Sequence, residues 1–156
     1  MTLLDTELFI TRLINAPPSA VWQAWSRADL LIKWWIPAPM ECKVIKLDLR
    51  PGGGFETQMR QGDDAFSPHV EGCFLDVAPN QRLVWTTCLG DGWRPLEPWL
   101  ALTAEITFTA EGSGTRYSCL VKHKTAADSK KHADLGFADG WGQTIDQLAV
   151  LVSQQA

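Results

Sequence analysis

The sequence is poor in the features that mark nucleic-acid-binding, membrane and secreted proteins. Its 14 Lys and Arg are outnumbered by 18 Asp and Glu, and Lys130-Lys131 is the longest basic run, so no footprint for a phosphate backbone exists. No apolar run approaches the roughly 20 residues of a membrane helix. The N-terminus, MTLLDTELFI, lacks the basic stretch that opens a signal peptide. We therefore expect a cytoplasmic protein with no nucleic-acid partner and no membrane partner.

Cysteine is also sparse, and its spacing excludes the common metal motifs. The four cysteines, Cys42, Cys73, Cys88 and Cys119, are scattered along the chain. They form no CxxC motif, and no histidine accompanies them at the spacing of a zinc site. This pattern predicts free thiols in a reducing compartment, with no metal and no other cofactor.

Tryptophan, in contrast, is abundant. The 156 residues include eight tryptophans, and 46% of the residues are hydrophobic. A chain of this length is expected to form one domain, residues 1–156, with a core that needs neither disulfides nor metal. The tryptophans favour a large apolar interior or a cavity with aromatic walls.

The first third of the chain predicts a strand followed by two short helices. Residues 6–15 are apolar and β-branched, which favours a strand. Pro17-Pro18 suits a helix entry, and Val21, Trp22 and Trp25 lie on one apolar side of the helix that follows. A second short helix is predicted from Ala28 to about Trp35, because prolines stop it soon afterwards.

From Glu41 onward the hydrophobic period becomes two. Ile45, Leu47 and Leu49 alternate with charged residues, and PGGG at Pro51–Gly54 is typical of a tight turn. Further strands are predicted over residues 55–60, 69–77, 81–89, 100–110 and 115–123. We expect Gly72 to mark a bulge or a close approach of two backbones. Together these strands predict an antiparallel sheet with one buried face.

The C-terminal part returns to a helical period. The apolar stripe of one long helix consists of Phe137, Trp141, Ile145, Leu148 and Val152. Gly136 and Gly140 fall inside that helix, where we expect them to allow close approach to the sheet or a kink. The predicted fold class is α+β: a curved antiparallel sheet of about six or seven strands around a long C-terminal helix, with two short helices after the first strand.

Six segments in this order carry a family resemblance over nearly the whole chain, from Ile10 to Leu151. They are INAPPSAVWQAWS, LLIKWWIP, LDLRPGGGFE, VEGCFLDVAPNQRLVWT, LTAEITFTAEGSGTRYSCLVKH and GWGQTIDQL. The chain resembles the START-like, or SRPBCC helix-grip, superfamily. Within it, the chain is similar to homologues of the activator of the 90-kDa heat-shock-protein ATPase, in the manner of that activator's C-terminal domain.

The resemblance implies a cavity between the concave face of the sheet and the C-terminal helix. Relatives in the superfamily bind lipids, hormones and polyketides, and some are cyclases or hydrolases. The eukaryotic co-chaperone that names the family has a separate N-terminal domain, which this sequence lacks. Heat-shock protein 90 is therefore not an expected partner.

Strand parity and the helical stripe then suggest which side chains line the cavity. The candidate ligand-binding residues are Trp34, Trp35, Trp85, Ile106, Phe108, Tyr117, Cys119, Val121, His123, Phe137, Trp141 and Ile145. Plain core packing is the alternative for every apolar member. Adjacent helical residues point about 100° apart. We therefore expect one of Trp34 and Trp35 in the core and the other at the cavity entrance.

Three polar residues are the candidates for catalysis. His123 shares the inward parity of apolar neighbours, as a hydrogen-bonded core group or as a catalyst. His69 and Glu71 lie two apart on one strand, so they form either an acid/base pair or a solvated strand end. His132 lies among lysines and is predicted to be on the surface.

Three functions remain open, and the first is preferred. The chain binds an apolar or aromatic small molecule in its cavity. Alternatively, it is an enzyme of polyketide cyclase, dehydratase or hydrolase type in the same cavity, with His123, His69 and Glu71 as acid or base. The third hypothesis is a co-chaperone-like or regulatory interaction domain with Trp93 and Trp99 as an exposed patch. A homodimer is compatible with each.

Overall fold

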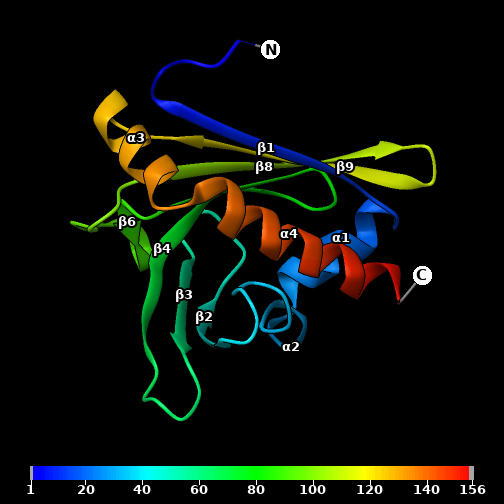
Figure 1. Ribbon diagram of the computed structural model, residues 1–156, viewed down its shortest axis with the longest axis horizontal. Coiled ribbons are helices and arrows are strands. Elements are labelled where there is room, and N and C mark those ends of the chain that lie inside the picture. The colour runs from blue at the N-terminus through cyan, green and yellow to red at the C-terminus, as the bar shows by residue number, and fades with distance from the viewer. Residues whose placement is uncertain (1, 155–156) are drawn as a thin grey trace.

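The computed structural model describes residues 2–154, and within them a seven-stranded antiparallel sheet wraps around the helices (Figure 1). Across the sheet the order is β1 (Glu7–Ile14), β9 (Gly114–Lys122), β8 (Thr103–Glu111), β5 (Arg82–Thr86), β4 (Ser67–Ala78), β3 (Gly54–Arg60) and β2 (Glu41–Leu47). A separate two-stranded ribbon joins β6 (Leu89–Gly90) to β7 (Arg94–Pro95), with a 3₁₀ turn, η1 (Asp91–Trp93), between them. The predicted α+β class and strand number are confirmed.

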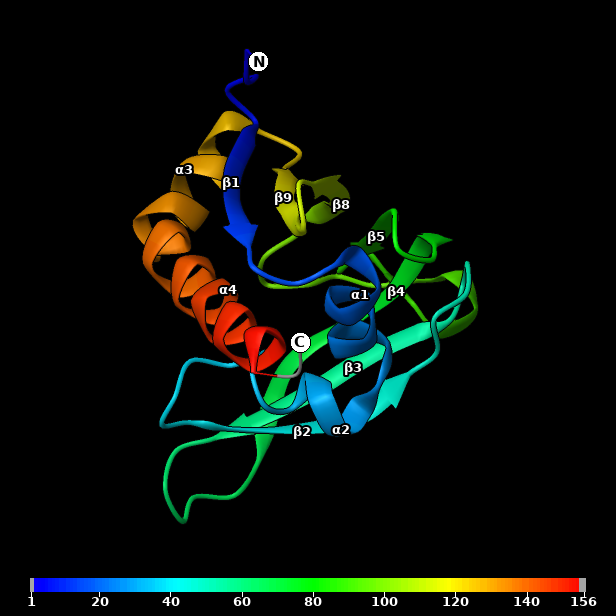
Figure 2. The ribbon, with the colours of Figure 1, turned by 90° about the vertical axis from the view of Figure 1, so that its right-hand side faces the viewer.

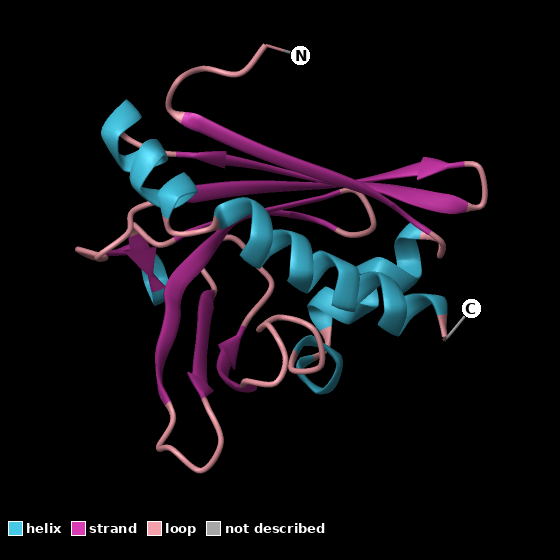
Figure 3. Cartoon of the chain, in the orientation of Figure 1, coloured by secondary structure: helices cyan, strands magenta, loops and turns pink. Residues whose placement is uncertain are grey.

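Helices cover the concave side of this sheet. Helices α1 (Pro18–Ser26) and α2 (Ala28–Leu31) follow β1, and α3 (Ala126–Asp134) and α4 (Phe137–Ser153) follow β9. Figure 2 shows the strands arching from β1 round to β2, with α3 and α4 along the open side and α1 inside the arch. Helix α1 packs against β8, β9 and α4, whereas α2 lies near β2. Figure 3 shows the same arrangement by element type. The two short helices after the first strand are confirmed.

Irregular pairing helps the sheet to bend. The register shifts between Val44 and Lys46 on β2, between Thr57 and Gln58 on β3, and again on β4 near Leu75. An extra residue in one strand of a pair bends that strand and increases its twist. The regular β8–β9 hairpin, in contrast, keeps one register throughout, with Ile106 opposite Cys119.

Two local predictions are corrected. The second short helix ends at Leu31 instead of near Trp35, and the chain continues in turns in which the amides of Trp34 and Trp35 both bond to the Leu31 carbonyl, at 3.2 and 3.1 Å. Ile45 was expected on the buried face of its strand, yet it is 43% exposed. It is the extra residue at the β2 shift, and the bulge turns its side chain outward.

The long C-terminal helix is confirmed as α4, which carries the whole predicted stripe, but it begins at Phe137, so it is preceded by Gly136 instead of containing it. Gly136 has φ 96°, in the left-handed region that glycine adopts without steric cost, and it separates α3 from α4. Gly136 therefore provides the predicted change of direction. Gly140, inside α4, has no neighbouring atom within 4 Å of the position that a Cβ would take. It neither kinks the helix nor allows close approach to the sheet.

The Gly72 prediction is confirmed as a close approach. A Cβ on Gly72 would collide with the carbonyl oxygen of Thr86 on β5. The two backbones meet here because the inner face of the sheet is tightly curved. A side chain at this position would force the strands apart.

The packed half of the interior is built largely from aromatic rings. Trp25, on α1, is fully buried, and its Nε1–H donates to the Tyr117 hydroxyl at 2.8 Å. The Nε1–H of Trp34 donates to the Ala24 carbonyl at 2.9 Å. Phe55 and Phe74 stack beside them with ring centroids 5.1 Å apart. Each such ring removes roughly 150–250 Å² from water, and each buried indole here also has a partner for its polar end.

The Trp25–Tyr117 bond gives the first prediction. Replacing Tyr117 with Phe leaves the buried Trp25 Nε1–H without an acceptor, which costs about 1–3 kcal/mol of the free energy of unfolding. Urea denaturation measures this loss. Ser118→Ala on the same strand is the control, because that hydroxyl bonds Thr11 at a partly exposed site and its loss is smaller. Equal stability of Tyr117→Phe and the parent would contradict the assignment.

Candidate functional site

A cavity of about 620 Å³ lies between the sheet and the junction of α3 and α4. Strands β3, β4 and β5 supply one wall, the two helices supply another, and the segment before β8 closes a third side. The bordering residues are Trp35, Pro37, Met40, Met59, Pro68, His69, Val70, Glu71, Trp85, Thr87, Leu96, Glu97, Pro98, Trp99, Leu100, Leu102, His132, Leu135, Gly136, Phe137, Gly140, Trp141 and Thr144. This is the position that the family resemblance implies for a ligand.

Aromatic side chains form much of the cavity wall. Trp85 and Trp141 face one another with their ring planes 9° apart and their centroids 6.3 Å apart. Phe137 lies one helical turn before Trp141, with ring centroids 5.0 Å apart. Trp35 borders the cavity from the α2 side and contacts Trp85 at 5.8 Å. Such walls suit a ligand with a large apolar surface.

Of the twelve candidate ligand-binding residues, the structure brings four to the cavity: Trp35, Trp85, Phe137 and Trp141. Trp34 lies in the packed core, 1% exposed. His123 lies behind the wall, against His132. The other candidates belong to the buried core cluster and not to the described cavity wall: Ile106, Phe108, Tyr117, Cys119, Val121 and Ile145. Contact of any of the twelve with a ligand stays a prediction.

The indole of Trp85 has an unmet hydrogen-bonding requirement. Its side chain is 2% exposed, and its Nε1 is the one fully buried side-chain nitrogen or oxygen in residues 2–154 that lacks a partner. A buried donor without an acceptor costs about 1–3 kcal/mol. The Trp85 ring borders the cavity, but its Nε1 has no surface open to it, so a ligand in the cavity does not relieve this cost.

Two buried histidines form a relay that ends at the cavity. The Thr6 carbonyl lies 3.0 Å from His123 Nδ1, and His123 Nε2 lies 2.9 Å from His132 Nδ1. A carbonyl only accepts, so the single proton of a neutral His123 is on Nδ1, and its Nε2 accepts from His132 Nδ1–H. His132 in its neutral form therefore keeps a lone pair on Nε2. That nitrogen makes no hydrogen bond within residues 2–154, and its residue borders the cavity.

A second chain of hydrogen bonds ends at His69. The Trp35 Nε1–H donates to Thr57 Oγ1 at 3.3 Å, and the same oxygen lies 3.0 Å from His69 Nδ1. Thr57 is fully buried, so its hydroxyl hydrogen is assigned to the only acceptor described beside it, His69 Nδ1. The proton of neutral His69 is then on Nε2. The two chains thus give the cavity wall a histidine donor and a histidine acceptor.

Both histidines at the cavity are neutral at pH 7. Removal from water lowers the pKa of His69 to about 4. The same desolvation, together with the neighbouring His123, lowers the pKa of His132 to about 4. No Lys or Arg is among the bordering residues, whereas two carboxylates, Glu71 and Glu97, are exposed at the rim. The cavity therefore carries no positive charge, and its entrance is acidic.

Two predictions about polar residues are corrected. His132 was expected on the surface but is 6% exposed, because α3 turns at Gly136 and packs it against Phe137 and His123. His69 and Glu71 form no hydrogen bond or ion pair within the described residues. The extra residue at the β3–β4 shift is His69 itself, so it turns inward to Thr57 while Glu71 stays exposed. His123 is a buried, hydrogen-bonded group.

Several cavity residues were missed by the sequence analysis. Leu96, Pro98 and Leu100 come from the segment between β7 and β8, which has no periodicity. Met40 and Met59 come from a turn and a strand end. Leu100 has the inward parity of the predicted strand over residues 100–110, which could have identified it, whereas nothing in the local sequence marks the others.

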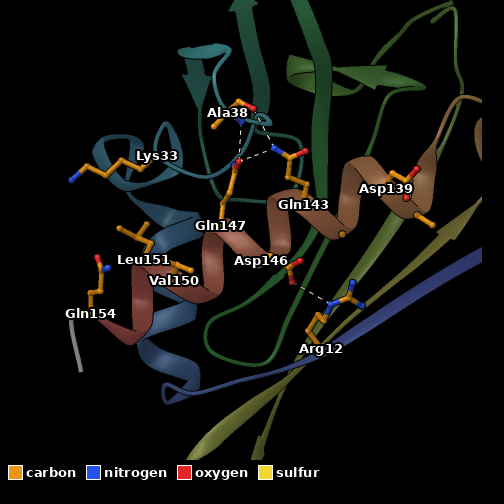
Figure 4. A pocket seen from close by; sticks show the side chains of 12 residues that line it. Arg12, Lys33, Ala38, Asp139, Gln143, Asp146, Gln147, Val150, Leu151 and Gln154 are labelled. Carbon is orange, nitrogen blue, oxygen red and sulfur yellow. Dashed lines mark hydrogen bonds and ion pairs between the residues drawn. The ribbon is translucent and has the colours of Figure 1, made fainter.

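A larger hollow, about 780 Å³, is an open groove along the outer side of α4 (Figure 4). Gln147 Nε2 donates to the carbonyls of Trp34 and Ile36, both at 3.0 Å, and its Oε1 accepts from the Ala38 amide at 2.8 Å. Arg12 pairs with Asp146 at 3.4 Å across the same groove. Gln147 thus holds residues 34–38 to the helix, and the Arg12–Asp146 pair links β1 to it, so both have structural roles.

The described residues show little sign of thiol, metal or membrane chemistry. Burial raises the pKa of Cys119 to about 12 and that of Cys42 to about 11, so both thiols stay protonated at pH 7. Within residues 2–154, no group of three His, Cys, Asp or Glu side chains is arranged to hold a metal ion. No helix in that range is long and apolar enough to cross a membrane.

The two exposed tryptophans each lie against a different neighbour. Trp93 is 48% exposed and its ring lies over Gly52, whereas Trp99 is 71% exposed and lies under the Lys131 ammonium, 5.3 Å from the ring centroid. Trp99 borders the cavity entrance and Trp93 does not.

The depressed histidine pKa values predict a pH dependence of stability. Unfolding returns His69 and His132 to a pKa near 6.5, so the unfolded chain binds more protons between pH 6.5 and about 4. The free energy of unfolding therefore falls over this window as pH is lowered, by up to about 3 kcal/mol for each histidine. Urea denaturation across the window measures the slope. His69→Asn should reduce it, and an unchanged slope in that variant would contradict a buried neutral His69.

Comparison with known proteins identifies one family model and several solved structures that are similar to this chain. The family model described as "Activator of Hsp90 ATPase homolog 1-like protein" matches residues 15–153. A protein from Nitrosomonas europaea of known crystal structure is 38% identical, with a TM-score of 0.88 over 99% of this chain and 98% of that one. A protein from Chromobacterium violaceum is 25% identical, with a TM-score of 0.71 over 93% and 96%. One from Mycobacterium smegmatis is 24% identical, with a TM-score of 0.79 over 94% and 90%.

No curated protein matches the chain. The family model covers most of the sequence, and the Nitrosomonas protein aligns with this chain along nearly the whole length of both proteins. The order of elements, a sheet wrapped around a C-terminal helix, is that of the helix-grip fold. The chain therefore belongs to the family of proteins like the activator of Hsp90 ATPase homolog 1, within the START-like superfamily.

Proposed function

We propose that this protein binds an apolar or aromatic small molecule in the cavity between its sheet and the α3–α4 junction. The observation that carries the proposal is a cavity of about 620 Å³ whose wall includes His132, with a free lone pair on its Nε2. Well-packed interiors rarely keep an open volume of this size or leave a polar atom at its wall without a partner. A ligand accounts for both.

The size and lining of the cavity support this function. Binding sites for small molecules have volumes of about 300–1,000 Å³, with mainly apolar walls and a few polar groups. Here Trp35, Trp85 and Trp141 supply the apolar walls, and His69 and His132 supply polar groups. The α4 helix leaves space at Gly140, where no side chain fills the volume.

An enzyme of cyclase, dehydratase or hydrolase type in the same cavity is the second candidate. The observation that favours it is the free Nε2 of His132, which His123 holds in an accepting state. A base with a pKa of about 4 is weak at neutral pH, where effective general bases have a pKa near the working pH. His69 lacks Glu71 as a partner, so the proposed acid/base pair is not assembled. These facts make binding the better-supported function.

Filling the cavity from α4 tests the proposal. Gly140→Leu adds a side chain to open space and replaces a poor helix former by a good one, so stability stays equal or rises by about 0.5–1 kcal/mol. The affinity for N-phenyl-1-naphthylamine, a neutral apolar fluorophore, should fall by about tenfold or more, which is 1.4 kcal/mol. Fluorescence titration measures the affinity, and thermal unfolding measures the stability.

Ala138→Leu is the matched control, because Ala138 is exposed and borders the outer groove. It should bind the fluorophore as the parent does. Equal binding by Gly140→Leu, or no binding by the parent, would remove the proposed function.

A further inference from the structure

We infer that the cavity selects an uncharged ring compound carrying a hydroxyl group, and that it rejects the corresponding carboxylate; this inference rests on the proposed binding function. The observations behind it are the direction of the His132 acceptor, which His123 sets, and the charges around the cavity. They concern what the cavity recognises, beyond the apolar binding proposed above.

The hydrogen-bond acceptor at the cavity wall is His132 Nε2, and the residues behind it, His123 and Thr6, determine that it accepts. The Thr6 carbonyl accepts from both the backbone amide and the Nδ1 of His123, at 2.9 and 3.0 Å. His123 Nε2 is then an acceptor, and it takes the Nδ1 proton of His132 at 2.9 Å. Because the two nitrogens of an imidazole point away from each other, His132 Nε2 is directed away from His123 with its lone pair free. A ligand placed there must donate.

The walls around this acceptor are aromatic. The ring centroid of Trp141 is 6.0 Å from that of His132 and 6.3 Å from that of Trp85. A hydroxyl group on a ring compound donates one hydrogen bond, so it meets the requirement of His132 Nε2 while the ring lies against these walls. An ether, a ketone or a hydrocarbon has no proton to donate.

The charges around the cavity favour a ligand with a hydroxyl group over one with a carboxylate. The bordering residues include no Lys or Arg, and Glu71 and Glu97 are at the rim. Lys131, close to the entrance, is exposed and bonded to the Trp99 carbonyl at 3.0 Å. Burying an ionised carboxylate without a cationic partner costs several kcal/mol. The free lone pair of His132 also repels an ionised oxygen, which only accepts.

Three probes of one shape test the inference. They are biphenyl, 4-hydroxybiphenyl and biphenyl-4-carboxylate, titrated at pH 7 by isothermal calorimetry or equilibrium dialysis with the parent protein. We expect 4-hydroxybiphenyl to bind about tenfold more tightly than biphenyl, equivalent to 1.4 kcal/mol. Biphenyl-4-carboxylate should bind more weakly than both. His132→Phe should abolish the advantage of the hydroxyl while biphenyl itself still binds.

The outcomes separate the two proposals. Equal binding of biphenyl and 4-hydroxybiphenyl, or tightest binding of the carboxylate, overturns the selectivity and leaves the binding function intact. Binding of N-phenyl-1-naphthylamine with no binding of 4-hydroxybiphenyl also overturns it. Failure of all three probes and of the fluorophore removes the binding function and the selectivity together. If His132→Phe does not fold, the ranking of the three probes with the parent protein decides the question.

Discussion

The ring of Trp35 separates a filled core from an open cavity, and much of the interior depends on its position. It contacts Trp25, Trp34 and Phe55 on one side, with centroids 5.0–5.5 Å away, and Trp85 and His69 on the other, at 5.8 and 6.2 Å. Its Nε1–H is held by Thr57. A smaller side chain here would join the core to the cavity and let the packed rings relax into it.

Trp34, the neighbour of Trp35, shows why the chain carries two tryptophans at this turn. Its indole is bonded to the Ala24 carbonyl beneath α1, so it fixes the turn to the core. Gln147 on α4 then binds the backbone carbonyl of Trp34 from outside. With the backbone held on both sides, the next residue can extend its ring to the cavity wall.

The polar groups at the cavity depend on partners that lie deeper in the protein. The lone pair of His132 is set by His123 and, behind it, by the Thr6 carbonyl. The proton of His69 is set by Thr57 and Trp35. Burial lowers the pKa of both cavity histidines, which keeps each of them neutral and its hydrogen-bonding direction fixed. Recognition at the wall is therefore a consequence of packing behind it.

The fold was largely predictable from sequence because long segments obey a single period. The β8–β9 hairpin alternates without interruption, and its register follows from that alternation. Prediction failed where one residue interrupts a period: Ile45 and His69 are extra residues at register shifts, and Gly136, expected inside the C-terminal helix, is the break before it. Bulges of this kind depend on the partner strand, which a local pattern does not contain.

The cavity was harder to predict than the fold. Strand parity identifies inward side chains, but it does not distinguish those that touch other side chains from those that face empty volume. Ile106 and Trp85 have the same inward direction on neighbouring strands, yet only Trp85 reaches the cavity. The difference arises because α3 and α4 meet at an angle and Gly140 leaves space, and both facts involve segments far apart in the sequence.

The central claim is that His132 Nε2 presents a free lone pair to a ligand donor, and the imidazole signals in a long-range ¹⁵N–¹H spectrum test it directly. His132→Phe identifies the His132 signals among those of the three histidines. On addition of 4-hydroxybiphenyl, the His132 Nε2 signal should move upfield, because an unprotonated imidazole nitrogen shifts in that direction when it accepts a hydrogen bond. The signal of His123 Nδ1, already bonded to the Thr6 carbonyl, should stay in place. A His132 Nε2 signal that does not move while the ligand binds would contradict the account.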